Sequence, residues 1–280
     1  MSPKNIVKCI LCDMDGVLRI GNQPITERIQ SIFYYFKQLK IQPIIITNEC
    51  RYTNHKIYED LLNMDIIDKS IDIPLITSAN VCKSWLENYV YTNNNLYSKF
   101  NVCVIGEKGL KTNINEIKSV VLNVNNKYCD NLDTKNILVL GSLFNYTQNQ
   151  KQIINEWLSN PETLIVKTCD DYTDPEDNCI LPNTILKQHN RTAHINTGKP
   201  DVNYTKEIQK LLKKYNLQNT KSEEIMLIGD SMNTDIKLGN KMNYKTTLVL
   251  SGNTKINDLG SYTYKPDYII PSISNIKLLV

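Results

Sequence analysis

Apolar runs alternate with segments of helical periodicity along most of the chain. The run over 6–12 is broken only by Lys8 and predicts a buried strand. A polar turn over 21–26 follows. Apolar residues then recur at helical spacing over 29–39, which predicts a helix with Thr26 as its N-cap.

The same alternation continues to the end of the chain. Further strands are expected over 43–48, 75–77, 101–106, 119–124, 137–140, 163–169, 193–197, 224–230, 246–250 and 268–270. Further helices are expected over 53–64, 78–91 (capped by Thr77 or Ser78), 148–158, 182–190, 202–215 and 234–243, with a short last helix from 271.

Strands and helices at this spacing form βαβ units, so the fold class that we expect is α/β with a Rossmann-like, doubly wound parallel sheet. Ligands of such sheets bind at the carboxyl ends of the strands. Four predicted strands end in polar residues, and we expect these endings to meet at one rim. They are Asp13-Met14-Asp15, Thr47-Asn48, Gly198-Lys199 and Gly229-Asp230.

Two polar breaks divide the pattern. One is the stretch over 91–95, and the other follows the predicted helix over 182–190. We therefore expect a core domain made of residues 1–92 and 189–280, and an inserted α/β domain made of residues 93–188.

The first polar ending carries two carboxylates. In extended backbone, Asp13 and Asp15 point to the same side, and Gly16 lets the chain turn directly after them. Like charges this close repel, and a bound divalent cation resolves the repulsion. A ligand set made of oxygen favours Mg²⁺. The alternative is an ordinary strand that ends in a polar turn.

Composition excludes some classes of function. The net charge is only +3 and the basic residues are dispersed, which argues against a nucleic-acid platform. No apolar run approaches the roughly 20 residues that span a bilayer, and no signal peptide is visible, so we expect no membrane partner. Cys9 and Cys12 have CxxC spacing, but in a strand they point to opposite faces, so we expect neither a zinc site nor a redox motif. The 8 cysteines are expected to be free thiols of a cytoplasmic protein.

The expected rim combines the groups that phosphoryl transfer needs. Its carboxylates, hydroxyl, amide and ammonium come from Asp13, Asp15, Asp230, Asp235, Thr47, Asn48 and Lys199. Carboxylates can hold Mg²⁺, attack phosphorus or transfer protons. The other groups, with backbone N–H groups at the Gly16 turn, can bind phosphoryl oxygens.

These motifs resemble those of the haloacid dehalogenase (HAD) superfamily. Asp13-Met14-Asp15-Gly16-Val17 is similar to its first motif, Thr47 to its second, Lys199 to its third, and Gly229-Asp230-Ser231-Met232-Asn233-Thr234-Asp235 to its fourth. The insert is similar to the C2-type cap of this superfamily. Segments such as Ile76-Thr77-Ser78-Ala79 resemble the NagD-like branch, which contains 4-nitrophenylphosphatases and phosphoglycolate phosphatases.

The resemblance implies catalytic and metal-binding roles for the carboxylates. Asp13 would be the nucleophile and a metal ligand. Asp15 would be the acid/base, with its backbone carbonyl on the Mg²⁺. Asp230 would be a further metal ligand, and Asp235 would support the metal through water or hydrogen bonds.

The resemblance also implies where the substrate binds. Gly16, Thr47 and Asn48 would bind its phosphate, and Lys199 would steady both this phosphate and the nucleophile. In the cap, two further residues would contact the substrate, namely Tyr146 and Asp171.

The chain departs from the branch pattern at three places. Glu49 and Cys50 follow the Thr-Asn pair where the branch has a second Asn and then Ser or Ala. A carboxylate there would oppose phosphate binding unless it turns away or pairs with Arg51. The helix before the third motif is short, and the acidic loop over 170–177 would disfavour a strongly anionic substrate if it faced the site.

Our leading hypothesis is therefore a Mg²⁺-dependent phosphatase that hydrolyses a small phosphorylated metabolite through an aspartyl-phosphate on Asp13. The alternative is a HAD-fold protein with weak or no catalysis that binds phosphometabolites as a regulatory module, which Glu49 suggests. A receiver-like signalling domain also gathers Asp, Thr and Lys at strand ends, but the chain length, the insert and Asp15 disfavour it. By analogy with the branch, we expect any homodimer to form through the cap.

Overall fold

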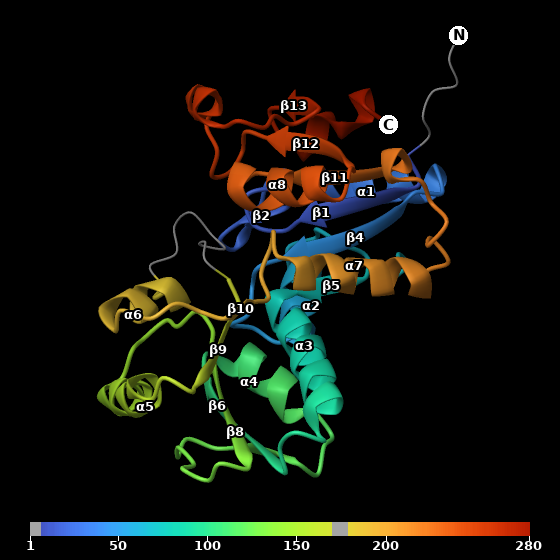
Figure 1. Cartoon of the computed structure of the whole chain (residues 1–280). Helices are drawn as coiled ribbons and strands as arrows, with labels where there is room; N and C mark the ends of the chain where they lie inside the picture. The colour runs from blue at the N-terminus through green and yellow to red at the C-terminus, as the bar shows by residue number, and fades with distance from the viewer. Residues whose placement is uncertain (1–6, 170–178) are drawn as a thin grey trace.

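Two parallel sheets form the framework of the chain, and helices cover both of them (Figure 1). A computed structural model describes residues 7–169 and 179–280. The first sheet has the strand order β13-β12-β11-β1-β4-β5, and every neighbouring pair in it is parallel. The second sheet has the order β10-β9-β8-β6-β7 and is also parallel throughout. The predicted α/β class with a doubly wound parallel core is thereby confirmed.

The strands have the following bounds. The first sheet contains β1 (Cys9–Asp13), β4 (Gln42–Thr47), β5 (Leu75–Thr77), β11 (Ile225–Gly229), β12 (Lys245–Val249) and β13 (Tyr268–Ile270). The second contains β6 (Lys99–Ile105), β7 (Leu122–Val124), β8 (Thr134–Leu140), β9 (Leu164–Lys167) and β10 (Ile195–Asn196). A separate hairpin after β1 pairs β2 (Arg19–Ile20) with β3 (Gln23–Pro24).

The helices connect these strands. They are α1 (Ile29–Gln38), α2 (Asn54–Asn63), α3 (Ser78–Asn93), α4 (Lys108–Asn115), α5 (Gln148–Ser159), α6 (Pro182–Gln188), α7 (Val202–Lys214) and α8 (Lys237–Lys241). Shorter turns are η1 (Ser222–Glu224), the π-helical η2 (Met232–Ile236), η3 (Ile256–Ser261) and η4 (Ile273–Leu278).

The central strand β1 shows why the first sheet is covered on both faces. Ile10 and Cys12 pack in one apolar cluster with α1, whereas Cys9 and Leu11 pack in another with α7. Every residue of β1 is buried because successive side chains alternate between these two layers. The prediction that Cys9 and Cys12 point to opposite faces is thereby confirmed.

The two helix caps that we predicted have different outcomes. Thr77 caps α3 and forms a reciprocal capping box with Asn80. Helix α1 begins only at Ile29, so the prediction of Thr26 as its N-cap is wrong. The Thr26 hydroxyl accepts only a 3.4 Å hydrogen bond from the backbone N–H of Arg28, within the turn that precedes the helix.

The strand before Lys199 corrects our picture of the two domains. It was expected at the rim of the core sheet, but β10 pairs with β9 in the second sheet. Helix α3, which our expected limits place mostly in the core, packs Cys82 and Leu86 against residues of β6 and β8. Elements that lie before and after the range 93–188 in the sequence, α3 and β10, therefore belong with the second sheet.

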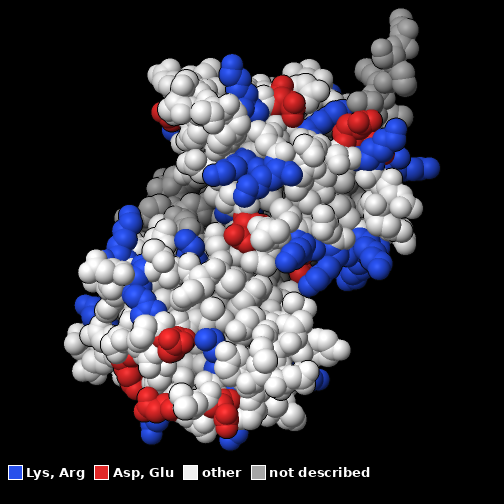
Figure 2. All heavy atoms as spheres, viewed as in Figure 1, with Lys and Arg blue, Asp and Glu red and all other residues white. Residues whose placement is uncertain are grey.

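The surface carries a local group of basic side chains. Figure 2 shows them over α7, where they are Lys206, Lys210, Lys213 and Lys214. The basic residues are thus less dispersed than the sequence suggested. Among the helices of residues 7–169 and 179–280, none is long and apolar enough to cross a membrane.

The fully buried Tyr204 joins α7 to the rim of the core sheet. Its hydroxyl lies 2.9 Å from the backbone carbonyl oxygens of Thr47 and Ile76, at the ends of β4 and β5. We expect Tyr204→Phe to lower the free energy of unfolding by about 1–2 kcal/mol, because buried carbonyls lose their donor. Urea denaturation measures this change.

A control at the opposite end of α7 tests whether burial causes the effect. The Tyr215 hydroxyl donates to the exposed Asp72 carboxylate at 3.0 Å. Tyr215→Phe should change the free energy of unfolding by no more than about 0.5 kcal/mol. Equal effects of the two substitutions would contradict this account.

Candidate active site

Three buried carboxylates converge at the carboxyl edge of the core sheet. Asp13 ends β1, Asp230 follows the adjacent β11, and Asp235 lies in η2. One oxygen from each lies within 4.8 Å of the others. The π-helical turn brings Asp235 back to the strand end, where its Oδ2 accepts a 3.2 Å hydrogen bond from the N–H of Ser231. Three of the four predicted carboxylates therefore form one cluster.

Lys199 supplies the positive charge of this cluster. Its Nζ donates to Oδ1 of Asp13 and to Oδ1 of Asp235, both at 2.7 Å. Burial acts to lower the pKa of Lys199, but the two carboxylates outweigh burial and raise the pKa well above its usual value. The ammonium group is therefore charged at neutral pH.

Lys199 does not balance the full negative charge of the three carboxylates. Burial, followed by the charge of Asp235, raises the pKa of Asp13 well above its ordinary value. Burial and Asp235 also raise the pKa of Asp230 to about 7. Three carboxylates against one ammonium leave two negative charges when all groups are ionised. An oxygen-only site with this charge fits a hard divalent cation.

Two glycines make room for Asp230. A Cβ at Gly16 would lie 2.4 Å from its Oδ2, and one at Gly252 would lie 2.0 Å from the same atom. The N–H of Asn253 donates to this oxygen at 2.6 Å. The backbone turns after β1 and after β12 thus fix this carboxylate.

The backbone N–H of Gly16 donates to the carbonyl of Arg19 at 2.7 Å within the turn. A contact of Gly16 with phosphate stays a prediction. With a φ of +79°, Gly16 also occupies the left-handed region, which glycine adopts without steric cost. Its function is to permit the tight turn and the close approach of Asp230.

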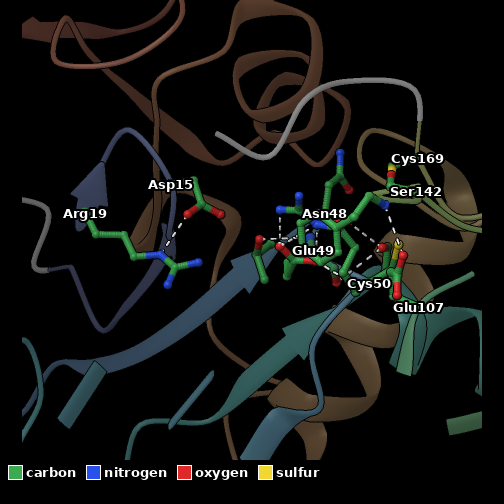
Figure 3. Close-up of polar contacts among 12 residues, drawn as sticks. Asp15, Arg19, Asn48, Glu49, Cys50, Glu107, Ser142 and Cys169 are labelled. Carbon is green, nitrogen blue, oxygen red and sulfur yellow. Dashed lines mark hydrogen bonds and ion pairs between the residues drawn. The ribbon is translucent and has the colours of Figure 1, made fainter. Parts of the chain in front are cut away.

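Asp15 lies apart from the three clustered carboxylates. Its Oδ1 accepts a 2.8 Å hydrogen bond from Nε of Arg19, and both side chains are buried (Figure 3). The separation agrees with a different function for Asp15 than for Asp13. No function was predicted for Arg19 from the sequence, although it lies only four residues after Asp15 across a tight turn.

Thr47 and Asn48 end β4 beside the cluster, as predicted. The Thr47 hydroxyl accepts a hydrogen bond from the N–H of Glu49 at 3.0 Å. Asn48 Oδ1 accepts one from the backbone N–H of Lys199 at 2.7 Å. Asn48 thereby fixes the backbone that carries the ammonium group. Contacts of Thr47 and Asn48 with phosphate stay predictions.

Glu49 is neutralised by Arg51. Nη2 of Arg51 lies 2.6 Å from Oε2 of Glu49, and Nε lies 3.1 and 3.2 Å from the two carboxylate oxygens. The backbone N–H of Arg51 donates to the same group at 2.6 Å. The pairing that we considered is therefore confirmed. The guanidinium also lies 4.8 Å from the ring centroid of Phe144 in the inserted region.

The two cap residues expected to contact the substrate have different outcomes. Asp171 and the acidic loop over 170–177 lie outside the described residues. Tyr146 packs against the apolar cluster around Trp157, and Nζ of Lys151 lies 5.3 Å from its ring centroid. None of its recorded contacts reaches the carboxylate cluster, and its function in substrate binding stays a prediction.

Comparisons with known proteins agree with this geometry. Residues 10–118 match the family model described as haloacid dehalogenase-like hydrolase, and residues 196–276 match a second model described as HAD-hydrolase-like. The chain is 36% identical over 64 residues to the ribonucleotide monophosphatase NagD of Escherichia coli K12, a stretch that covers 23% of this chain and 26% of that protein. It is 24% identical over 275 residues to the dihydroxyacetone phosphatase of Corynebacterium glutamicum, covering 95% and 89% of the two chains.

Solved structures of known proteins share the fold of this chain. The 4-nitrophenylphosphatase of Thermotoga maritima superposes with a TM-score of 0.75 at 18% identity, covering 97% of each chain. NagD of Escherichia coli K-12 superposes with a TM-score of 0.70 at 20% identity, covering 97% of this chain and 98% of that one. At these identities the likeness establishes the fold.

The raised pKa of Asp230 predicts how stability depends on pH. Its pKa is about 7 in the folded protein and about 3.9 in an unfolded chain. A raised carboxyl pKa stabilises the folded state below the unfolded value, and this contribution is lost as pH rises through the folded value. Without a divalent cation, the unfolding temperature should therefore fall as the pH rises from about 4 to about 7. Added Mg²⁺ should raise it more at the higher pH.

Differential scanning fluorimetry in EDTA and in Mg²⁺ measures both effects. Asp230→Asn removes the titrating group, and this variant should lose the pH-dependent gain from Mg²⁺. The same gain at both pH values in the parent protein would show that Asp230 does not take part in cation binding.

Glu49→Gln tests the buried ion pair. The substitution removes the carboxylate charge from a buried ion pair, and we expect the free energy of unfolding to fall by about 3–5 kcal/mol. Adding Arg51→Met to the same chain should recover part of this loss, because an apolar replacement removes the buried charge. Glu116→Gln, which breaks an exposed pair with Lys83, is the matched control and should cost at most about 1 kcal/mol. A Glu49→Gln effect no larger than the control would refute the assigned importance of the pair.

Proposed function

Since the chain belongs to the haloacid dehalogenase-like hydrolases, we propose that it is a Mg²⁺-dependent phosphatase that hydrolyses a small phosphorylated metabolite through an aspartyl-phosphate on Asp13. The observation that carries this proposal is the buried cluster of Asp13, Asp230, Asp235 and Lys199. The names of the relatives, a ribonucleotide monophosphatase and a dihydroxyacetone phosphatase, support a small phosphate ester as substrate.

The chemistry follows from the two aspartates at the end of β1. A carboxylate oxygen of Asp13 attacks phosphorus, and the bond between phosphorus and the leaving oxygen breaks. Asp15 gives its proton to that oxygen. Asp15 then takes a proton from water, the resulting hydroxide attacks phosphorus, and the bond to Asp13 breaks. Inorganic phosphate leaves and both side chains return to their initial states.

The charges around Asp13 support its proposed function as the nucleophile. Lys199 contacts Asp13 directly and can offset the negative charge that collects around phosphorus. Oxygens of Asp13 and Asp230, with the backbone carbonyl of Asp15, would hold Mg²⁺, and Asp235 would orient this set. When bound, Mg²⁺ neutralises charge on the phosphoryl group. Thr47 and Asn48 lie beside the cluster and would bind the phosphoryl oxygens.

The alternative of a binding or regulatory protein loses its main support. It depended on Glu49 as a repulsive charge next to the phosphate. The ion pair with Arg51 neutralises that charge. All eight cysteines are free, which supports our further proposal that the protein works in a reducing compartment such as the cytoplasm.

Asp13→Asn tests the nucleophile. The substitution keeps the shape of the side chain but removes the attacking carboxylate, so we expect Mg²⁺-dependent hydrolysis of 4-nitrophenyl phosphate to fall by at least about 10³-fold. Asp258→Asn is the control, because Asp258 only accepts a hydrogen bond from the backbone of Lys255 at the surface. Its rate should equal that of the parent.

A second readout identifies the intermediate. Rapid acid quenching followed by intact-mass spectrometry should detect one phosphoryl group on the parent protein and none on Asp13→Asn. A parent protein that binds Mg²⁺ but hydrolyses no phosphomonoester would favour the binding-protein alternative. An Asp13→Asn variant as active as the parent would exclude Asp13 as the nucleophile.

A further inference from the structure

A cavity of about 570 Å³ opens beside Asp15. Its walls come from the hairpin after β1, from the segment after β4 and from α2. Among its lining residues are Asp15, Arg19, Arg51, Tyr52, Lys56 and Asp60. None of the three clustered carboxylates lines it. Of the proposed catalytic carboxylates, the cavity therefore borders only Asp15 among the described residues. In the proposed reaction, Asp15 is the group that protonates the leaving oxygen.

Arg19 has hydrogen-bond donors, its two Nη nitrogens, at the wall of this cavity. Its side chain is buried, with only 7% of the residue exposed. Nε donates to Asp15 at 2.8 Å, as the dashed line in Figure 3 shows. Among residues 7–169 and 179–280, no hydrogen bond or ion pair joins these Nη atoms to a protein group. Since Arg19 lines the cavity, the outer edge of its guanidinium is available to a ligand there.

The other charges of the cavity wall are paired more completely. Arg51 is held by Glu49 through two side-chain nitrogens. Nζ of Lys56 lies 2.6 Å from Asp60 at the solvent side of α2. Among the described residues of the wall, Arg51 and Lys56 therefore each have a carboxylate partner, and the guanidinium of Arg19 is bonded to Asp15 through Nε alone. Arg19 is the cation closest to the chemistry, because it is the one bonded to Asp15.

We propose that Arg19 is a specificity-determining residue that binds a second oxyanion, a carboxylate or a phosphate, on the leaving group of the substrate. The inference rests on the proposed phosphatase function and adds a substrate class to it. A planar guanidinium edge matches the two oxygens of such a group. Because Nε of the same side chain holds Asp15, the second oxyanion must lie within a few atoms of the ester oxygen that Asp15 protonates.

A set of small esters isolates this interaction. Ethyl phosphate lacks a second oxyanion, 2-phosphoglycolate carries a carboxylate in its place, and ethylene glycol bisphosphate carries a second phosphate. We expect the ratio of kcat/KM for an oxyanion-bearing ester to that for ethyl phosphate to fall by about 10- to 100-fold in Arg19→Gln, which is the value of a hydrogen bond to a charged group. A fall in the ratio for 2-phosphoglycolate indicates a carboxylate site, and a fall in the ratio for ethylene glycol bisphosphate indicates a phosphate site.

Using a ratio separates recognition from positioning. If Arg19 only orients Asp15, its loss slows all three esters alike and the ratio stays constant. Arg19→Lys keeps the charge without the planar edge and should give an intermediate ratio, and it serves as the test variant should Arg19→Gln fail to fold. Lys56→Gln is the matched control, since it removes a cation from the exposed part of the same wall and should change the ratio by less than about threefold.

Binding gives an outcome that does not depend on turnover. Calorimetric titration of the Asp13→Asn protein with Mg²⁺ and each ester should show tighter binding of at least one oxyanion-bearing ester, and Arg19→Gln should abolish that preference. Preferential binding without hydrolysis by the parent would uphold the inference and refute the phosphatase function. Hydrolysis of all three esters with a ratio that Arg19→Gln leaves unchanged would refute the inference and uphold the phosphatase function. Equal binding of the three esters in the presence of Arg19 would refute the inference in either case.

Discussion

The contact of Lys199 with Asp13 and Asp235 is the interaction on which the site depends. Burying three carboxylates within one small volume is unfavourable because desolvation and mutual repulsion both disfavour the charged forms. One ammonium at 2.7 Å from two of them offsets part of this cost. The remaining charge is what makes the cluster suited to a divalent cation. Lys199, for which we propose a function in catalysis, is thus also the counter-ion of the buried carboxylates.

The origin of Lys199 makes the two sheets interdependent. It follows β10, which pairs in the second sheet, yet its ammonium reaches the rim of the first. Oδ1 of Asn48, directly after β4, accepts a 2.7 Å hydrogen bond from the backbone N–H of Lys199. Nearby, Ser78 donates to the carbonyl of Asn48 at 2.7 Å, and the N–H of Gly109 donates to the carbonyl of Arg51, also at 2.7 Å. The segment that follows β4 is therefore held by residues that follow β10 or belong to α3 and α4.

Strand-end reasoning predicted the carboxylates well and their surroundings poorly. Asp13 and Asp230 were placed correctly because parallel neighbouring strands bring their carboxyl ends to one edge, whatever the details of packing. The strand before Lys199 was assigned to the wrong sheet because a two-residue strand carries no pattern that identifies its partner. Helix α4 was not predicted, since few of its residues are apolar and buried, among them Leu110 and Ile114. The pairing of Glu49 with Arg51 was considered from sequence, but its geometry depends on a loop conformation that periodicity does not describe.

Charge is distributed along the proposed direction of the reaction. Asp13 and Asp230 belong to the carboxylate cluster, which suits a cation and the phosphoryl group. Asp15 is outside that cluster and is bonded to the guanidinium of Arg19, at the wall of a separate cavity. In the proposed phosphoryl transfer, electrons move from the attacking carboxylate toward the leaving oxygen, so negative charge develops on the oxygen that Asp15 would protonate. The hydrogen bond between Arg19 and Asp15 places the guanidinium charge next to the proposed proton donor. An anionic group on the leaving part of the substrate would be attracted to the same guanidinium. The arrangement therefore couples the choice of leaving group to the position of the residue that protonates it.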